Sequence, residues 1–207
     1  MAAPEPHKGM DAGRVVGFTD GLFVVAATLL VVSIDIPNIP ERDVATQLPH
    51  ALDDIVPQLV SYFISFAVIV LFWFRHHALF DRVHTHDARF VALNMVFLAF
   101  IAVLPFPSEL LGKYGDETIS VVIYAINVLV LSSLLIALYV YSERKGLVHA
   151  EVKRGGLYRV RALSVLLVFG ASIPIAVIFG ARAAEYTWLG MFIVPRLLSR
   201  ATRGRYS

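Results

Sequence analysis

The chain has 207 residues, of which 57% are hydrophobic and only 16% are charged. Soluble domains carry about 25% charged residues, so this composition predicts an integral membrane protein. The chain contains no cysteine, which excludes disulfides and thiolate metal sites. The net charge of +2 does not indicate a nucleic-acid partner, and we expect none.

Six apolar segments follow a polar stretch at residues 1–12, which we expect to form a flexible cytoplasmic tail. The segments predict an all-α channel domain over residues 13–203, followed by a short tail at 204–207. Six transmembrane helices are expected at residues 13–36, 56–80, 89–104, 119–141, 162–179 and 185–198. The sixth segment is shorter than the roughly 17–25 residues of a typical span, so an interfacial helix is the alternative there.

The basic residues are distributed unevenly over the predicted loops. With six spans, one side of the membrane holds only Arg42, Lys113 and Arg182, and the other holds the remaining 15 of the 18 Lys and Arg residues. Cytoplasmic loops are enriched in basic residues, so both termini are expected in the cytoplasm of a multi-pass cell-membrane protein. The basic loop 144–161 follows the same rule, and binding of anionic lipid is a further possibility there.

An apolar stripe with helical spacing runs along the first predicted helix. It consists of Leu22, Val25, Leu29, Val32 and Ile36. If copies of the helix surrounded an axis, Val25, Leu29 and Val32 would form apolar rings that gate by dewetting. Thr28 would add a hydroxyl ring, and Asp35 an acidic ring that attracts cations at the outer mouth. The same stripe also suits packing against lipid or other helices, so its spacing alone does not distinguish a pore lining from a packing surface.

Histidines cluster near the cytoplasmic end of the second segment. The cluster comprises Trp73, Arg75, His76 and His77, with His84 and His86 shortly after. Histidine-box enzymes draw metal ligands from several helices, whereas these residues share one short stretch, so we expect neither a metal nor an enzyme. A zinc-binding or proton-sensing site is the alternative interpretation of this cluster. The simplest interpretation is hydrogen bonding to neighbours such as Arg14, Asp20 and Asn94. No phosphate loop, dinucleotide fingerprint or nucleophile elbow is present.

The sequence Arg14-Val-Val-Gly-Phe18-Thr19-Asp20 resembles the R-x-x-x-F-S-D signature of the transmembrane protein 175 family. These proteins are endosomal and lysosomal potassium channels and their bacterial relatives. The resemblance continues through the rest of the first helix, through FWFRHHALF in the second segment, and to Asn94 in the third. It covers residues 14–104. Thr19 replaces the signature Ser and keeps its hydroxyl.

The resemblance implies a potassium-permeable cation channel that needs no cofactor. The animal subunit carries two six-helix repeats, so a single-repeat chain is expected to be a homotetramer whose first helices line a central pore. By position, Val25 is the bottleneck, and Leu29 and Val32 form further apolar rings. Thr28 is the hydroxyl layer for potassium preference, in place of a carbonyl filter.

The resemblance also implies that the signature residues hold the pore helix in place. Arg14, Phe18, Thr19 and Asp20 are expected to bond with residues of the second and third helices. These partners are Trp73, His77 and Asn94. The alternative function is a proton- or cation-coupled secondary transporter that uses the histidines of the second helix.

Overall fold

The structure is a computed structural model that describes residues 12–148, 156–191 and 194. These residues form α-helices and one short 3-10 helix, η1, and contain no β-strand beyond an isolated bridge between Val83 and Val148. The elements are α1 Ala12–Val32, η1 Glu41–Asp43, α2 Val44–Phe80, α3 Ala88–Val103, α4 Pro105–Tyr114, α5 Thr118–Arg144, α6 Gly156–Phe179 and α7 Ala181–Trp188. Of the predicted tail at 1–12 only Ala12 is described, as the first residue of α1, and the predicted tail at 204–207 lies outside the described residues.

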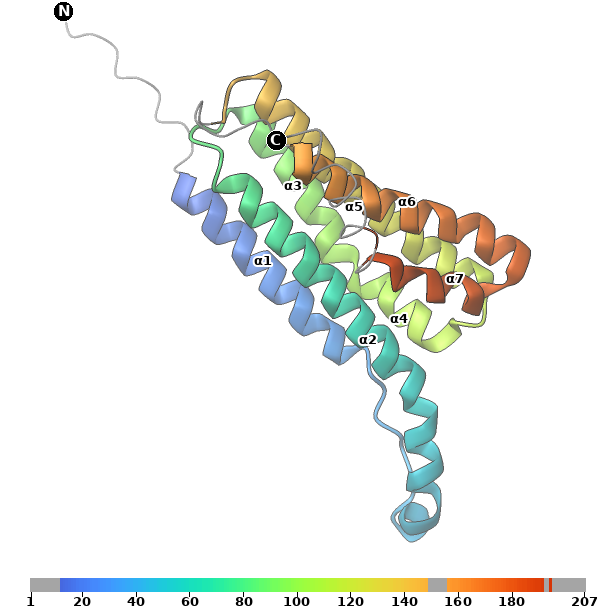
Figure 1. The fold of residues 1–207 in the computed structure, drawn as a ribbon. Coiled ribbons are helices and arrows are strands. Elements are labelled where there is room, and N and C mark those ends of the chain that lie inside the picture. Colours follow the sequence, from blue (N-terminus) through green and yellow to red (C-terminus); the bar gives the residue numbers. More distant parts are fainter. Residues whose placement is uncertain (1–11, 149–155, 192–193, 195–207) are drawn as a thin grey trace, which may run out of the picture.

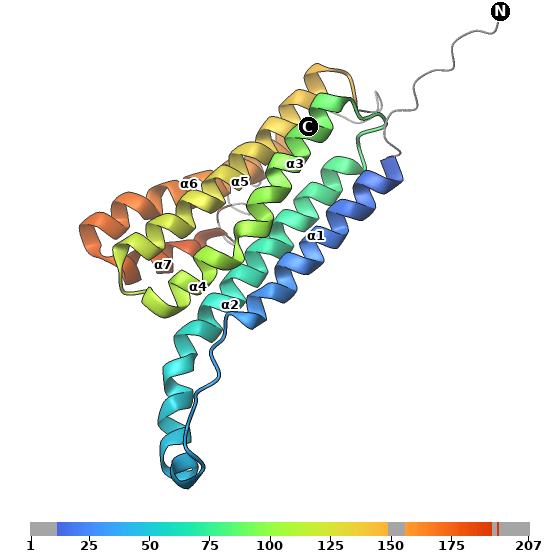
Figure 2. The same cartoon turned by 180° about the vertical axis from the view of Figure 1, so that it is seen from behind.

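The helices form a bundle with α1 and α2 side by side along one edge (Figure 1). Helix α1 packs on α2 and α3, and α3 packs in turn on α5. Figure 2 shows α5 and α6 beside each other on the far side of α3. Helix α5 is central, because Leu131, Leu135 and Leu138 on it are completely buried. This arrangement leaves one side of α1 without a partner inside the protomer.

Four helical stretches among the described residues are long and apolar enough to cross a membrane. They are Gly13–Val32, Glu41–Phe80, Ala88–Tyr114 and Thr118–Arg144, and Leu163–Phe179 is a shorter apolar stretch. The predicted sixth span, 185–198, overlaps the end of α7, and residues 192–193 and 195–198 lie outside the described part of the chain. The prediction of an all-helical membrane protein is confirmed.

Helix α2 begins at Val44, well before the predicted start at residue 56. It includes Pro49 and Pro57, which deprive the carbonyls of Ala45 and Asp53 of their helical N–H partners. Both of those residues are exposed, so water can bond to the two carbonyls. The prolines therefore did not end the helix, and this part of α2 extends beyond α1 (Figure 1).

Two further boundaries differ from the sequence prediction. Helix α1 ends at Val32 rather than at residue 36, in a tighter turn in which the Ser33 and Ile34 amides bond to the Leu30 and Val31 carbonyls. Pro37 has no N–H to continue the helical bonding to the Ser33 carbonyl. The loop expected after residue 104 is instead helix α4, which starts at Pro105. Proline is well tolerated in the first turn of a helix, where its missing N–H would have no partner.

Helices α2 and α4 approach each other closely around Gly112. A Cβ atom at Gly112 would lie 3.1 Å from the Cα of Gln58 and 3.4 Å from the Cβ of Ser61. One turn away, the buried Ser61 hydroxyl donates to the Ser108 carbonyl at 2.6 Å. The absence of a side chain at Gly112 therefore allows this contact between the two backbones.

We predict that Gly112→Val destabilises the protein by about 1–3 kcal/mol, because the new side chain forces α2 and α4 apart. The measurement is the apparent melting temperature in detergent. Gly170→Val is the control, since a Cβ there would meet only Leu129 Cδ2 at 3.9 Å. Equal melting temperatures for the two variants would contradict close α2–α4 packing.

Candidate functional site

Helix α1 has one buried side and one exposed side within the protomer. Phe23, Ala26 and Leu30 are at most 2% exposed and pack against the neighbouring helices. Val25 is 55% exposed and Val32 is 76% exposed. Large apolar side chains that remain this exposed in a protomer are available to line a pore, contact another subunit or face lipid.

Thr28 lies on the exposed side of α1 between Val25 and Leu29. Its Oγ1 lies 3.0 Å from the Val24 carbonyl and 2.9 Å from the Val25 carbonyl, and it donates its proton to them. Because the proton is directed at the helix backbone, the lone pairs of the hydroxyl oxygen remain free. Thr28 therefore presents an acceptor, rather than a donor, to whatever lies beside α1.

A buried hydrogen-bond chain joins the first three helices near the base of α1. Asn94 on α3 is completely buried, and its Nδ2 donates to Thr19 Oγ1 on α1 at 3.2 Å. Its Oδ1 lies 2.7 Å from His76 Nε2 on α2. Since the amide oxygen can only accept, His76 must carry its proton on Nε2. Among the residues expected to hold the first helix in place, Thr19 and Asn94 are bonded to each other in the structure.

In the structure His76, rather than His77, bonds to Asn94. His77 instead stacks on Trp73 with ring centroids 5.5 Å apart, and its Nε2 lies 3.7 Å from Asp81. Neighbouring residues on a helix differ by about 100° in direction, so only one of two adjacent histidines can face the core. The helical spacing of Phe72, His76 and Leu79, all buried, carried the signal that identifies His76.

A second bond joins the signature to α2 on the more solvated side. Trp73 Nε1 donates to Asp20 Oδ1 at 3.0 Å, and both residues belong to the set that was expected to hold the first helix in place. Phe18 is 55% exposed, and Arg14 is also exposed, so neither is enclosed by α2 or α3 in the protomer. The signature therefore divides into two residues that bond inward and two that face outward.

The start of α3 is fixed by Asp87, which determines the position of Asn94 farther along the helix. Asp87 caps α3 by accepting from the Phe90 amide at 2.7 Å, and its other oxygen accepts from the Tyr141 hydroxyl of α5 at 2.6 Å. The bond from Tyr141, followed by the bond from Phe90, lowers the pKa of Asp87, so the cap stays ionised at neutral pH.

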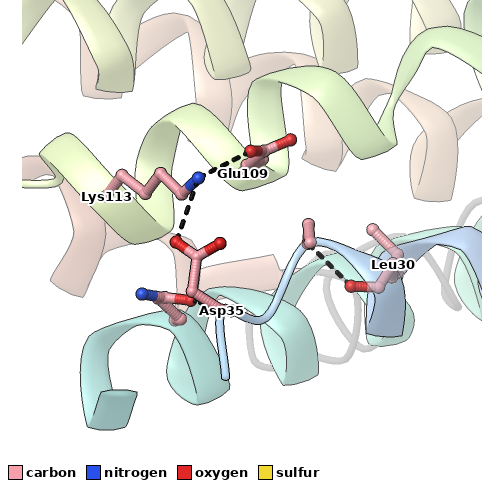
Figure 3. Close-up of polar contacts among 6 residues, drawn as sticks. Leu30, Asp35, Glu109 and Lys113 are labelled. Carbon is pink, nitrogen blue, oxygen red and sulfur yellow. Dashed lines mark hydrogen bonds and ion pairs between the residues drawn. The ribbon is translucent and has the colours of Figure 1, made fainter. Parts of the chain in front are cut away.

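At its other end, α1 is followed by Asp35, which the sequence predicted as an acidic residue at the outer mouth. Figure 3 shows Lys113 of α4 between Asp35 and Glu109. Lys113 Nζ lies 3.0 Å from Asp35 Oδ2 and 2.9 Å from Glu109 Oε1. Asp35 is thus an ion-paired carboxylate. Sequence reasoning missed this pairing because it placed Lys113 in a loop, where no helix fixed its direction.

The histidines of α2 do not form a metal site in the described part of the chain. Within that part, no group of three or more His, Cys, Asp or Glu side chains could hold a metal ion. His76 stacks on Phe80 and Phe97, with ring centroids 4.2 Å and 5.4 Å away, and is almost fully buried. Its surroundings are those of a residue that joins helices.

We predict that Asn94→Leu lowers the stability of the protein by about 1–3 kcal/mol, because Thr19 and His76 then lose their partner in a buried place. The readout is the apparent melting temperature in detergent. Ser133→Ala is the matched control, since the exposed Ser133 bonds only to the Leu129 carbonyl of its own helix. Unchanged melting of the Asn94 variant would show that the chain of bonds does not stabilise the base of α1.

Comparison with known proteins gives consistent results. The family model described as the endosomal/lysosomal potassium channel TMEM175 matches residues 14–105. A protein of Streptomyces collinus named as a potassium channel is 31% identical over 140 residues, which are 66% of each chain. A potassium channel of Chamaesiphon minutus is 35% identical over 115 residues, 55% of this chain and 54% of that one. The matches thus span about half to two thirds of these two relatives.

The human protein named endosomal/lysosomal proton channel TMEM175 is 38% identical over 116 residues, 54% of this chain and 23% of that one. The crystal structure of a lysosomal potassium-selective channel TMEM175 homolog from Chamaesiphon minutus superimposes with a TM-score of 0.73 at 22% identity. It covers 93% of this chain and 98% of that chain. These proteins are named as channels, a non-enzymatic function. The signature on α1, the matched family region and the shared fold together show that the chain belongs to the TMEM175 family.

Proposed function

We propose that the chain is a potassium-permeable channel, assembled as a homotetramer around an axis lined by α1. The observation that carries this proposal is the exposed apolar face of α1. At about 100° per residue, Val25, Thr28, Leu29 and Val32 fall within an arc of about 100°. The buried face, which includes Phe23, Ala26 and Leu30, is centred about 140° away. A pore-lining helix needs such a face, distinct from the one that packs in its own subunit.

The polar residues along the same face favour a pore over lipid. Thr28 lies within the apolar stretch, and Arg14 lies in the same arc at the base of the helix. Charged and polar groups within membrane segments generally face water or protein, because exposure to hydrocarbon is costly. The potassium-channel names of the bacterial relatives, and the proton-channel names of the animal ones, support the same class of function.

The proposed pore combines apolar rings with a hydroxyl layer. Val25, Leu29 and Val32 would form constrictions in which water is unstable when the rings are narrow, so that they close without a moving plug. Thr28 offers its hydroxyl oxygen between them, with the proton already donated to the backbone. The lone pairs of such oxygens can face a potassium ion and replace part of its hydration shell.

The bonds at the base would keep each α1 in register with its own subunit. Thr19 and Asp20 bond to α3 and α2, while Phe18 and Arg14 remain exposed for contacts with the axis or a neighbouring subunit. We place both termini in the cytoplasm and the protein in the cell membrane, from the distribution of basic residues. Anionic lipid is a candidate ligand of the loop 144–161, of which residues 149–155 lie outside the described structure.

The decisive experiment compares potassium and sodium flux through purified protein in liposomes, with the oligomer size measured on the same sample. A channel gives fast electrogenic flux, whereas a coupled transporter gives slow, saturable and pH-coupled uptake. The transporter alternative relied on the histidines of α2, and His76 is enclosed by aromatic rings and bonded to Asn94. This arrangement favours the channel.

We predict that Thr28→Val reduces the preference for potassium over sodium, because it replaces the hydroxyl oxygen with a methyl group of similar size. The measurement is the reversal potential under bi-ionic conditions. Thr118→Val on α5 is the control, because Thr118 bonds to the Ala176 carbonyl within the protomer, away from α1. An unchanged reversal potential for Thr28→Val would remove Thr28 from the selectivity mechanism.

We predict that Val25→Ala increases potassium flux several-fold by widening the narrowest apolar ring and easing its hydration. Val24→Ala is the matched control, since Val24 is 63% exposed but lies about 100° around the helix from Val25. Flux is measured at equal amounts of assembled protein. If Val24→Ala raises the flux and Val25→Ala does not, the axis runs along a different side of α1.

A further inference from the structure

Three charged side chains meet where α1 ends, and one of them is a cation between two anions. Lys113 Nζ lies 3.0 Å from Asp35 Oδ2 and 2.9 Å from Glu109 Oε1 (Figure 3). Glu109 and Lys113 are four residues apart on α4, so this bond aligns the ammonium group along its own helix. The bond to Asp35 crosses from α4 to the segment that follows α1.

Asp35 is positioned from two sides. Its backbone N–H donates to Gln58 Oε1 of α2 at 2.8 Å, while its side chain pairs with Lys113 of α4. The side chain of Asp35 is nevertheless 61% exposed, and that of Lys113 is 32% exposed. The carboxylate is therefore held in a defined place and still faces the solution from which ions enter.

Two carboxylates and one ammonium leave this cluster with one net negative charge per subunit. Without Lys113 the same cluster would carry two. We propose that Lys113 controls the local concentration of cations at the outer mouth of the pore. It limits the negative charge beside the end of α1 and positions Asp35 there. This inference rests on the proposed channel function, and it makes Lys113 a positioning and charge-setting residue for permeation.

The neighbouring ion pair of Arg182 and Asp116 contributes no net charge to the electric field beside Lys113. Arg182 Nε and Nη2 donate to the two oxygens of Asp116 at 2.6 Å and 3.1 Å. Arg182 lowers the pKa of Asp116, which therefore stays ionised, and the pair is neutral as a whole. A cavity of about 940 Å³ between α2, α4 and α7 is lined by this pair, by Lys113 and by the acidic residues Asp54, Glu117 and Glu185. Ions in solution can thus approach the cluster.

The test is whole-cell recording of potassium current, with the external ionic strength varied by replacing salt with sucrose. We expect Lys113→Met to raise inward current several-fold at low ionic strength, because each subunit adds one unit charge, and one unit charge about 10 Å from an ion in water gives a Boltzmann factor of about two. The increase should disappear near 1 M salt, where the Debye length is about 3 Å. Lys113→Arg keeps the charge and should restore the wild-type current.

Glu109→Gln tests the opposite sign while leaving the pair between Asp35 and Lys113 intact. It removes the net negative charge of the cluster in every subunit and should lower inward current several-fold at low ionic strength. The double variant Lys113→Met with Glu109→Gln has the wild-type net charge without the lysine bridge. Its current should return toward the wild-type value. Lys145→Met is the control, because it removes an exposed cation from the loop after α5 rather than from this face.

The outcomes separate this inference from the proposed function. Absence of potassium current in the wild-type protein would overturn the channel itself. A conducting wild type whose inward current at low salt is unaffected by Lys113→Met and by Glu109→Gln would overturn the role of Lys113 alone. Should Lys113→Met fail to assemble, Glu109→Gln still decides, since a loss of inward current that persists at 1 M salt would contradict a charge effect.

Discussion

The buried amide of Asn94 is the interaction on which the arrangement of the first three helices depends. It is one side chain with a donor bond to Thr19 of α1 and an acceptor bond from His76 of α2. Because the donor and acceptor of an amide lie at a fixed angle, the two bonds determine how α1 and α2 approach α3. In an apolar interior, an unpaired member would be costly, so the arrangement that satisfies all three is strongly favoured. With Thr19 directed inward, the other side of α1, which carries Val25 and Val32, is exposed.

Much of α1 and its base could be predicted from the sequence. The spacing along α1 indicated the face with Val25, Leu29 and Val32, and the signature identified Thr19 and Asp20 as bonding residues. Their contacts with Asn94 and Trp73 are present in the structure. These predictions succeeded because they concern side chains on long helices, whose directions follow from the helical repeat.

The features that were missed depend on where a helix begins or how it is rotated. Residue type alone does not distinguish His76 from His77, whereas the rotation of α2 directs His76 into the core. The pair between Asp35 and Lys113 depends on α4 being a helix, which the prolines at 105 and 107 concealed. Helix boundaries are governed by the local balance of caps, prolines and solvent access, and this balance is only partly visible in a residue pattern.

Helix α4 follows α3 directly, and each of the two helices holds a different end of α1, α3 by a hydrogen bond and α4 by an ion pair. Helix α3 ends at Val103 and α4 begins at Pro105, with only Leu104 between them. Asn94 lies before this break and bonds to the base of α1, whereas Lys113 lies after it and bonds to Asp35 beyond the other end of α1. The tilt of α1 is therefore tied to the angle between α3 and α4. A change of that angle at Leu104 would displace one end of α1 relative to the other without breaking either attachment.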